Sequence, residues 1–550
     1  MAPLDELCAS LEKAEVTNAV DGRDISIEVL RVKLEMAQMK NWFDQHYNDK
    51  EIFIPSYGVF SQDRFDDRLY SYKRIFVPND RFDAVFTSEV VRWLSKTADG
   101  LDIRDVIRGV ATLILIGRFD SNAISWLRKN FADMHLPVSY SEKNNSFTCL
   151  LETGDQREAS AADFLPNPRD CHKFERNQWL FLSPTFGNAE HFDRYPLFPV
   201  PITDCGQRGN SRGSCGNVWQ VKIHPAHLKA TERENEKFAL RAIDCYRQDE
   251  RDALRRAVNI EHDHLLKLVA SFYLKDCFIL FPWAEQGDLE HVWAGQMNTD
   301  ARTPKFVRWA FEQMAGLAAG LAKLNDPAEN LEEREDDHHG DLNPEAIFLF
   351  PDKSNTSLGT LRIAYAGLVR YHLPKTNSFS FPKHDQRCDS NLRYAPPESR
   401  FLEQGDKKLP GFDMWSLGCI YLEFIIWILG GYAELGKFRL AKRRDPFWYK
   451  LIKVDMAGKE YYLGPYIDPT VESAIKMVRR NKTCGRHTCF RDLLDIIEKH
   501  LLVVDMRKRM GSSELCGRLQ RILQEATKRP GYWGGKQESG FEPQSFSEGH

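Results

Sequence analysis

The sequence predicts an α+β protein in which a mostly helical first part is followed by a mixed part with strands and long helices. Apolar residues between positions 103 and 114 recur at the spacing of an amphipathic helix. The short apolar runs 347–350 and 361–364 are typical of two strands, and the turn-rich connection between them predicts a hairpin. Residues 414–433 form an apolar segment that is long enough for a central buried helix.

The composition is that of a soluble globular protein with two or three domains. The chain has 550 residues, of which 42% are hydrophobic and 28% are charged, and a single core seldom extends over so long a chain. The net charge of −4 and the scarcity of long basic runs argue against nucleic acid as a partner. Twelve scattered cysteines fit reduced thiols in a cytosolic or nuclear compartment. The first residues lack the pattern of a signal peptide.

Residues 1–190 are predicted to form a mostly helical region whose sequence indicates no particular chemistry. Helices are expected over 27–42, 103–114 and 121–131, where apolar residues follow helical spacing. The polar stretch that begins at Gly154 is expected to be a linker or a surface loop, because its residues favour turns.

The segment around position 341 is the most informative part of the chain. A charged loop, residues 337–343, precedes the first strand of the predicted hairpin, and a glycine-containing turn, residues 365–367, follows the second. Since the strands of a hairpin lie side by side, the loop and the turn would meet in space. This arrangement resembles the catalytic core of the eukaryotic protein kinases, whose H-R-D-L-x-x-x-N and D-F-G motifs flank such a hairpin. The resemblance places Asp341 at the position of the catalytic base.

Four positions near this loop depart from the kinase pattern. Ala346 stands where the family has a metal-binding Asn, and Tyr365 stands where the D-F-G motif has a metal-binding Asp. Asn343 replaces a usual Lys, and Gly340 replaces an Arg that receives the activation-loop phosphate. A methyl group and a phenol cannot replace two oxygen ligands of a hard cation. Metal assistance is worth several kcal/mol, so the resemblance implies a rate loss of roughly three orders of magnitude or more.

A glycine-containing loop lies upstream of these motifs. Residues 211–221 match G-x-G-x-x-G-x-V, with Gly213, Gly216 and Val218 at motif positions and Ser211 at the first glycine. Glycines let the backbone of such a loop approach phosphates closely, because a side chain would collide with them. An ordinary hairpin turn is the alternative explanation of the same residues.

The resemblance also implies an ATP site. Residues 238–243 resemble V-A-I-K, so Arg241 takes the place of the phosphate-anchoring Lys, although its wider planar group would hold a phosphate differently. Glu250 is the candidate for the helix residue that pairs with this position, and a solvated surface charge is the alternative. Backbone groups from Phe281 to Trp283 would face an adenine. Because the metal-binding positions are replaced, the resemblance implies either ATP bound without Mg²⁺ or no cofactor at all, and no metal ligand is predicted.

Further motifs extend the resemblance over roughly residues 200–525. Residues 394–398 resemble the A-P-E motif, residues 413–418 match D-x-W-S-x-G, and residues 501–509 resemble a late segment whose Arg pairs with the A-P-E Glu. This assigns Arg509 as the partner of Glu398. The resemblance implies a bilobal protein kinase-like fold. Its expected parts are the N-terminal region 1–190, a kinase-like domain 195–525 divided into a small β-rich lobe 195–283 and a large helical lobe 284–525, and a disordered tail 526–550.

Two other patterns have simpler explanations. His262 with His264, and Cys484 with Cys489, resemble metal ligands, but neither pair has the second pair at ligand spacing that a zinc site needs. The apolar segment 414–433 is about as long as a membrane span, yet it carries a glutamate near its middle. A buried central helix is therefore preferred to a span.

Three functions follow from these observations. The first is a pseudokinase, similar to fungal-type kinase domains with degenerate motifs, that acts as a regulatory or binding module for unidentified protein partners in the cytoplasm or nucleus. The second is a weak Ser/Thr kinase in which Asp341 serves as the base and Glu345 rescues metal binding. The third is an interaction protein whose N-terminal half carries the function.

Overall fold

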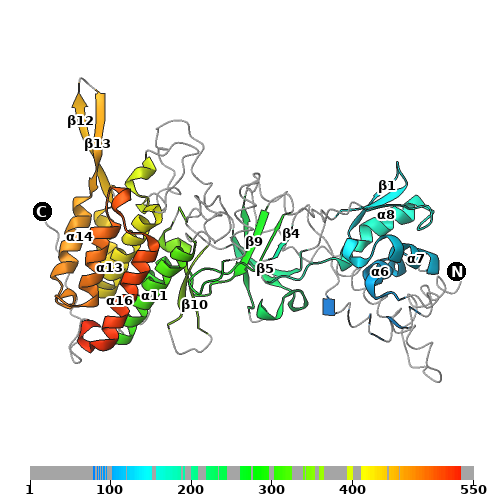
Figure 1. Cartoon of the computed structure of the whole chain (residues 1–550), viewed down its shortest axis with the longest axis horizontal. Coiled ribbons are helices and arrows are strands. Elements are labelled where there is room, and N and C mark those ends of the chain that lie inside the picture. Colours follow the sequence, from blue (N-terminus) through cyan, green and yellow to red (C-terminus); the bar gives the residue numbers. More distant parts are fainter. Residues whose placement is uncertain are drawn as a thin grey trace. The chain divides into compact units, whose positions relative to one another are not determined.

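The structure is a computed structural model with a mixed helix and sheet architecture (Figure 1). Apart from single positions between 79 and 95, it describes residues 102–118, 120–150, 157–187, 190–192, 200–208, 218–232, 235–243, 260–273, 277–295, 303–324, 339–340, 342–352, 358–364, 393–400, 411–442, 445–456 and 459–533. The chain divides into two compact units. The first unit takes in residues 1–207, 219–240 and 272–278, and the second unit takes in the rest. Each unit contains its own hydrophobic core.

Three helices and a small antiparallel sheet form the described N-terminal part of the first unit. They are α6 (Ile107–Leu115), α7 (Ser121–Asn130), α8 (Pro168–Asn177), β1 (Val138–Ser141), β2 (Ser146–Cys149) and β3 (Glu158–Ser160). Phe147 on β2 and Phe174 on α8 are completely buried, and Trp126 on α7 stacks on Phe164 at 4.2 Å between ring centroids. The aromatic core therefore joins α7 and α8 to the sheet.

Two helices of this region, α6 and α7, begin where acidic side chains accept hydrogen bonds from the first backbone N–H groups. Asp120 accepts a 2.8 Å hydrogen bond from the backbone N–H of Ala123 at the start of α7. Both carboxylate oxygens of Asp133 accept backbone N–H groups at the start of α6, from Arg108 and Gly109. Such caps stabilise a helix terminus by about 1 kcal/mol each. The helices predicted over 103–114 and 121–131 are thus confirmed, with the first starting four residues later.

Two features of this region differ from the prediction. The three-stranded sheet was not predicted, because its strands are short and β3 is polar. β3 also lies within the stretch that was expected to be a linker: Ser160 and Ala159 pair with Ser146 and Phe147 on β2. The helix expected over 27–42 lies outside the described residues.

A second sheet has six strands in the order β4-β8-β9-β7-β6-β5. They are β4 (Glu190–Phe192), β5 (Ile202–Arg208), β6 (Val218–Ile223), β7 (Phe238–Ile243), β8 (Ala270–Tyr273) and β9 (Cys277–Pro282). The residues that resemble V-A-I-K form β7, and the apolar run that begins at Phe278, which predicts a buried strand, belongs to β9. One small lobe over 195–283 stays a prediction.

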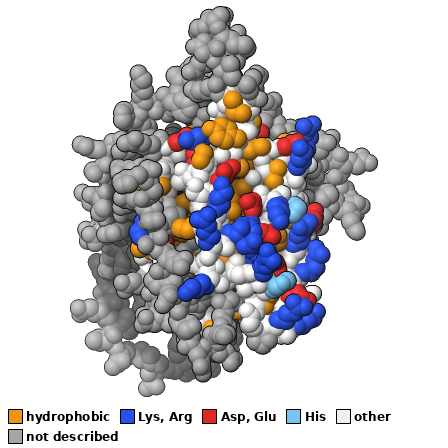
Figure 2. All heavy atoms as spheres, turned by 90° about the vertical axis from the view of Figure 1, so that its left-hand side faces the viewer, with side chains coloured by type: hydrophobic (Ala, Val, Ile, Leu, Met, Phe, Trp, Pro, Cys, Tyr) orange, Lys and Arg blue, Asp and Glu red, His pale blue; other side chains and the backbone are white. Residues whose placement is uncertain are grey.

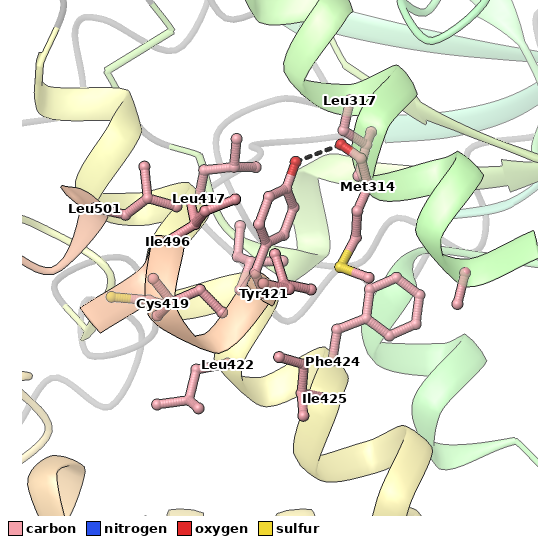
Figure 3. Packing of buried hydrophobic residues seen from close by; sticks show 14 of the residues in the cluster. Met314, Leu317, Leu417, Cys419, Tyr421, Leu422, Phe424, Ile425, Ile496 and Leu501 are labelled. Atoms are coloured by element: carbon pink, nitrogen blue, oxygen red, sulfur yellow. Dashed lines mark hydrogen bonds between the residues drawn. The ribbon is translucent and has the colours of Figure 1, made fainter. Parts of the chain in front are cut away.

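Helices dominate the second unit (Figure 1). They are α10 (Leu289–Ala294), α11 (Pro304–Leu324), α13 (Gly411–Ala441), α14 (Pro469–Arg480), α15 (Cys489–Ile496) and α16 (Ser512–Lys528). Eight apolar residues at helical spacing predict α11, and all of them are buried: Val307, Ala310, Phe311, Met314, Leu317, Ala318, Leu321 and Leu324. Figure 3 shows Tyr421 on α13 reaching α11, where its hydroxyl donates a hydrogen bond to the carbonyl of Met314. The core of this unit therefore forms around α13.

The apolar segment predicted as a central helix is interrupted. Gly431 has φ 75° and ψ −175° within α13, so two helices meet there at a kink. The break brings Arg439 back to Glu423, whose carboxylate accepts bonds of 3.0 and 2.7 Å from the Arg439 side chain. Among the described helices, α13 alone is long and apolar enough to cross a membrane, and the residues of its most apolar window are buried inside the protein.

Two antiparallel hairpins complete the second unit. β10 (Ile347–Phe350) pairs with β11 (Thr360–Ile363), which confirms the predicted hairpin. β12 (Tyr449–Met456) pairs with β13 (Lys459–Ile467) and extends away from the helices of this unit (Figure 1). This second hairpin was not predicted.

The end of the chain departs from the prediction of a disordered tail over 526–550. α16 continues to Lys528, and a 3-10 turn follows over Pro530–Trp533. Ala526 and Tyr532 are buried, and the Tyr532 hydroxyl donates a 2.5 Å hydrogen bond to Asp492. Burial of this aromatic ring anchors residues up to 533, and residues 534–550 lie outside the described part.

Candidate functional site

The predicted catalytic loop is held by the first turn of α13. The buried carboxylate of Asp413 accepts 2.7 Å hydrogen bonds from the backbone N–H groups of both His339 and Gly340. Gly340 has φ 74°, a backbone conformation that residues other than glycine rarely adopt. A glycine at this position thus fits the backbone that the two hydrogen bonds require. Asp341 itself lies outside the described residues.

The hairpin joins the loop to the start of the glycine-containing turn. The imidazole Nε2 of His339 lies 2.9 Å from the carbonyl oxygen of Ala364, directly after β11. The backbone N–H of Ala364 donates a 2.8 Å hydrogen bond to the carbonyl of Ala346, directly before β10. The ends of the two motifs are therefore adjacent, as the sequence predicted. Tyr365 lies outside the described residues.

Two of the substituted motif positions have structural roles. Asn343 is buried, and its side-chain oxygen accepts a 2.9 Å hydrogen bond from the backbone N–H of Glu345, which begins the short turn Pro344–Ala346. The methyl group of Ala346 is only 5% exposed. Asn343 caps this turn. Ala346 contributes a buried methyl group to the packing and has no side-chain oxygen that could bind a metal ion.

Glu345 is the acidic group of this segment. Its Oε2 atom is buried and has no hydrogen-bond partner among the described residues. Burial raises the pKa of Glu345, and the neighbouring carboxylates of Asp288 and Glu290 raise it further. The Oδ1 atom of Asp288 lies 2.8 Å from the Nδ1 atom of His291. These surroundings raise the pKa of Glu345 above its usual value, although His291 and Arg393 act in the opposite direction.

No described residues come together as a metal site: no group of three His, Cys, Asp or Glu side chains within the described ranges could hold an ion. His264 instead binds backbone, with its Nδ1 2.8 Å from the carbonyl oxygen of Leu361. Its ring lies so close to α11 that a Cβ atom on Gly316 would approach its Nε2 to 1.9 Å. Cys484 and Cys489 are buried free thiols.

Arg241 on β7 is a buried cation for which the described residues supply no counter-ion. Arg241 as a whole is only 7% exposed. The Nε and Nη2 atoms are buried and have no hydrogen-bond partner among the described residues. A buried guanidinium without partners is energetically unfavourable by several kcal/mol, so this group is suited to receive an anion. The predicted partner Glu250 lies outside the described residues.

The remaining predicted nucleotide-binding residues are only partly described. Phe281 at the end of β9 is buried, Trp283 directly after this strand is half-buried, and Val218 at the start of β6 is half-buried. β5 and β6 are neighbours in the sheet, so the predicted glycine loop connects adjacent strands. Gly213 and Gly216 lie outside the described residues.

The predicted pair of Arg509 and Glu398 is confirmed. Arg509 donates bonds of 2.5 and 2.8 Å to the two carboxylate oxygens of Glu398. Arg509 also lies over the ring of Trp415 on α13, at 5.1 Å from its centroid. The A-P-E-like segment is thereby fixed to the last part of the second unit.

Sequence reasoning missed a buried ionic network next to this segment. Arg439 binds Glu423 and, at 2.6 Å, Glu290 on α10. The hydroxyl of Tyr394 donates a 2.8 Å hydrogen bond to Glu423. The sequence signal for this network was Glu423, the single glutamate in the apolar segment. Its partner Arg439 lies sixteen residues later, beyond the kink at Gly431.

Comparison with known proteins adds no relative. No family model matches the chain, and no curated protein matches it.

Proposed function

We propose that residues 195–525 form a protein kinase-like domain without metal-dependent phosphotransfer, which acts as a regulatory or binding module. The observation that carries the proposal is the contrast within one loop. The backbone before Asp341 is fixed by Asp413, yet the position that would supply a metal ligand carries the buried methyl group of Ala346.

Three long-range connections support the kinase-like part of the proposal. Asp413 of the D-x-W-S-x-G-like segment binds the catalytic-loop-like segment, and Arg509 of the late segment binds Glu398 of the A-P-E-like segment. The hairpin of β10 and β11 brings the ends of the two central motifs together. Each connection joins segments that were matched to the family by sequence alone.

The residues present do not fit a catalytic Mg²⁺. Mg²⁺ requires oxygen ligands in near-octahedral geometry, and Ala346 and Tyr365 stand at the two protein ligand positions. Glu345 is a poor substitute, because its surroundings raise its pKa and so disfavour the charged form that would bind a cation. No step of the proposal uses a metal.

The residues present do fit an anion such as the phosphates of ATP. The orphaned guanidinium of Arg241 would pair with a phosphate and would exchange an unfavourable buried charge for a charge-assisted hydrogen bond. ATP bound in this way would carry its phosphates without a metal. The nucleotide would then stabilise a conformation that a partner protein recognises.

A phosphotransfer assay tests the proposal. Full-length protein with ATP and either Mg²⁺ or Mn²⁺ is expected to give no autophosphorylation and no transfer to a generic basic substrate above that of an Asp341→Asn variant. A double variant, Ala346→Asn with Tyr365→Asp, restores the two ligand types and is expected to acquire metal-dependent ATP binding. Transfer by the unaltered protein that Asp341→Asn abolishes would contradict the proposal.

A weak kinase is the second candidate, favoured only by the Oε2 atom of Glu345, which is buried close to the loop and has no hydrogen-bond partner among the described residues. If Glu345 rescues metal binding, Glu345→Gln removes the activity and leaves folding unchanged. The third candidate places the function in residues 1–190. Deleting them would cut through the first compact unit, so substitutions of exposed residues in α7 and α8 are the better test of that candidate.

A further inference from the structure

One stretch of the second unit is strongly basic in a chain that is acidic overall. Between positions 473 and 491 the sequence has six Lys and Arg and no Asp or Glu, while the whole chain has a net charge of −4. The six are Lys476, Arg479, Arg480, Lys482, Arg486 and Arg491. They lie on α14, on the connection that follows it and on the first turn of α15. Figure 2 shows Lys and Arg gathered on the face of the molecule to which α14 belongs.

The carboxylates next to this stretch are already bound by other groups. Asp495 on α15 accepts a 2.6 Å bond from Arg479, which also pairs with Glu498, and Lys499 lies 3.3 Å from Asp495. Asp492 accepts the hydrogen bond of Tyr532. These contacts occupy Asp495, Glu498 and Asp492, and no described carboxylate forms an ion pair with Arg480 or Arg486.

We define the basic patch as the exposed members of this stretch: Lys476, Arg480, Lys482 and Arg486. Lys476 has only a 3.8 Å contact with Glu472, through a side chain that is 69% exposed. Arg480 and Arg486 form no ion pair with any described residue. Because they are exposed, Lys476, Arg480 and Arg486 add little to the packing of the fold, and like charges placed so close to one another are unfavourable.

The backbone that carries the patch is fixed at several points. Asp468 caps α14, Asn481 caps the turn Lys482–Cys484, and Thr488 caps α15. Cys484 between them is completely buried. His487, which follows Arg486, has φ 68°, a conformation that is uncommon for a residue with a side chain. A surface held in this way loses little conformational entropy when it binds a partner.

We propose that the basic patch is a docking surface for an acidic, extended segment of a protein partner. Lys476 and Arg480 are one helical turn apart, about 6 Å along the axis, and side chains two residues apart in an extended peptide are separated by about 6.6 Å. Acidic residues at alternate positions of the peptide would therefore face these two cations. The exposed acidic residues Glu472 and Asp492 border the patch and limit its length, and a short positive surface suits a peptide segment better than a continuous nucleic-acid backbone. The inference does not depend on the kinase-like proposal.

Binding of a labelled peptide to the full-length protein tests this inference. The probe is a fluorescein-labelled peptide of alternating glutamate and alanine, measured by fluorescence anisotropy. The triple variant Lys476→Glu, Arg480→Glu, Arg486→Glu is expected to bind it about tenfold more weakly or worse, and binding to the unaltered protein is expected to weaken as salt is raised. Because the substituted side chains are exposed, the melting temperature of the variant is expected to stay unchanged.

A matched control separates the patch from net charge. The variant Lys305→Glu, Lys323→Glu, Arg521→Glu changes the charge by the same amount at exposed positions outside the patch, and it is expected to retain peptide binding. Equal loss in both triple variants, or no binding by the unaltered protein, would overturn the proposal. It would also be overturned if a single-stranded oligonucleotide or vesicles containing phosphatidylserine bound more tightly than the peptide and bound through the patch.

Discussion

Two buried arginines of the second unit have opposite surroundings. Arg439, near the end of α13, lies in a cage formed by Glu423, Glu290 and the ring of Trp293. Arg241, on β7, has two buried nitrogens without a hydrogen-bond partner among the described residues. Since a buried charge is tolerated only when it is paired, the first arginine is explained by the fold and the second requires a partner from outside the described structure.

Arg439→Met is expected to have the largest effect on stability. Burial alone would lower the pKa of Arg439, but the carboxylate of Glu423 outweighs it, so the pKa lies well above its usual value and the group is charged. Removing the arginine leaves Glu423 buried and unpaired, which is expected to destabilise the protein by about 3–5 kcal/mol. Chemical denaturation measures this effect. The double variant Glu423→Leu, Arg439→Met is expected to recover most of the loss, and a double variant as unstable as Arg439→Met would contradict the pairing.

Asp413→Ala is expected to have the next largest effect. It leaves the buried backbone N–H groups of His339 and Gly340 without acceptors, which is expected to lower stability by about 2–4 kcal/mol. Hydrogen exchange of these two amides, compared with that of the amides within α11, would localise the effect. Unchanged protection of both amides would show that Asp413 does not hold the loop.

His227 of the first unit extends the comparison to a buried group that is neutral. Its Nε2 accepts the backbone N–H of Asn79 at 3.1 Å, its Nδ1 lies 2.8 Å from the carbonyl oxygen of Pro184, and burial lowers its pKa to about 4. Between pH 6.5 and about 4, His227 therefore binds more protons in the unfolded chain than in the folded protein. The contribution of His227 is therefore complete above pH 6.5 and is lost as the pH falls toward about 4, by up to about 3 kcal/mol.

Melting temperatures of the unaltered protein and of His227→Gln between pH 4 and pH 8 would measure this dependence. Their difference is expected to shrink as the solution is acidified. Comparing the two proteins cancels the opposite contribution of Asp133, whose pKa burial raises to about 6. A difference that does not change with pH would mean that His227 contributes through packing alone.

Arg241→Met is expected to have the smallest effect on the free protein. Removing an unpaired buried charge is expected to leave stability unchanged or to raise it by about 1 kcal/mol, in contrast to Arg439→Met. Denaturation without ligand gives the value. A loss of about 3 kcal/mol would show that Arg241 is already paired, with Glu250 as the first residue to test.

Much of the second unit follows from its sequence, because its signals are local and strong. Eight apolar residues at helical spacing predicted α11, and two apolar runs around a turn predicted the β10–β11 hairpin. The pair of Arg509 and Glu398 came from the order of motifs. Those motifs also pointed to the loop that Asp413 holds, although they did not indicate the hydrogen bonds themselves.

Other features could not be predicted because they depend on contacts between distant residues. β1, β2 and β3 are short strands that become stable only when Phe147 is covered by α7 and α8. The pair of Glu423 and Arg439 exists because Gly431 breaks an apolar segment that has the length of one continuous helix. The sequence also cannot show that the guanidinium of Arg241 lacks a hydrogen-bond partner among the described residues, because that depends on which side chains lie near it in the fold.

Thermal stability with ATP, in the presence of Mg²⁺ or of a chelator, tests the central claim most directly. We expect ATP to raise the melting temperature of the full-length protein by a few degrees in both conditions, and we expect Arg241→Met to abolish the rise. The contradicting result is a rise that requires Mg²⁺, which would mean that a metal site survives despite Ala346 and Tyr365. A rise that persists in Arg241→Met would likewise show that the orphaned arginine is not the phosphate-binding group.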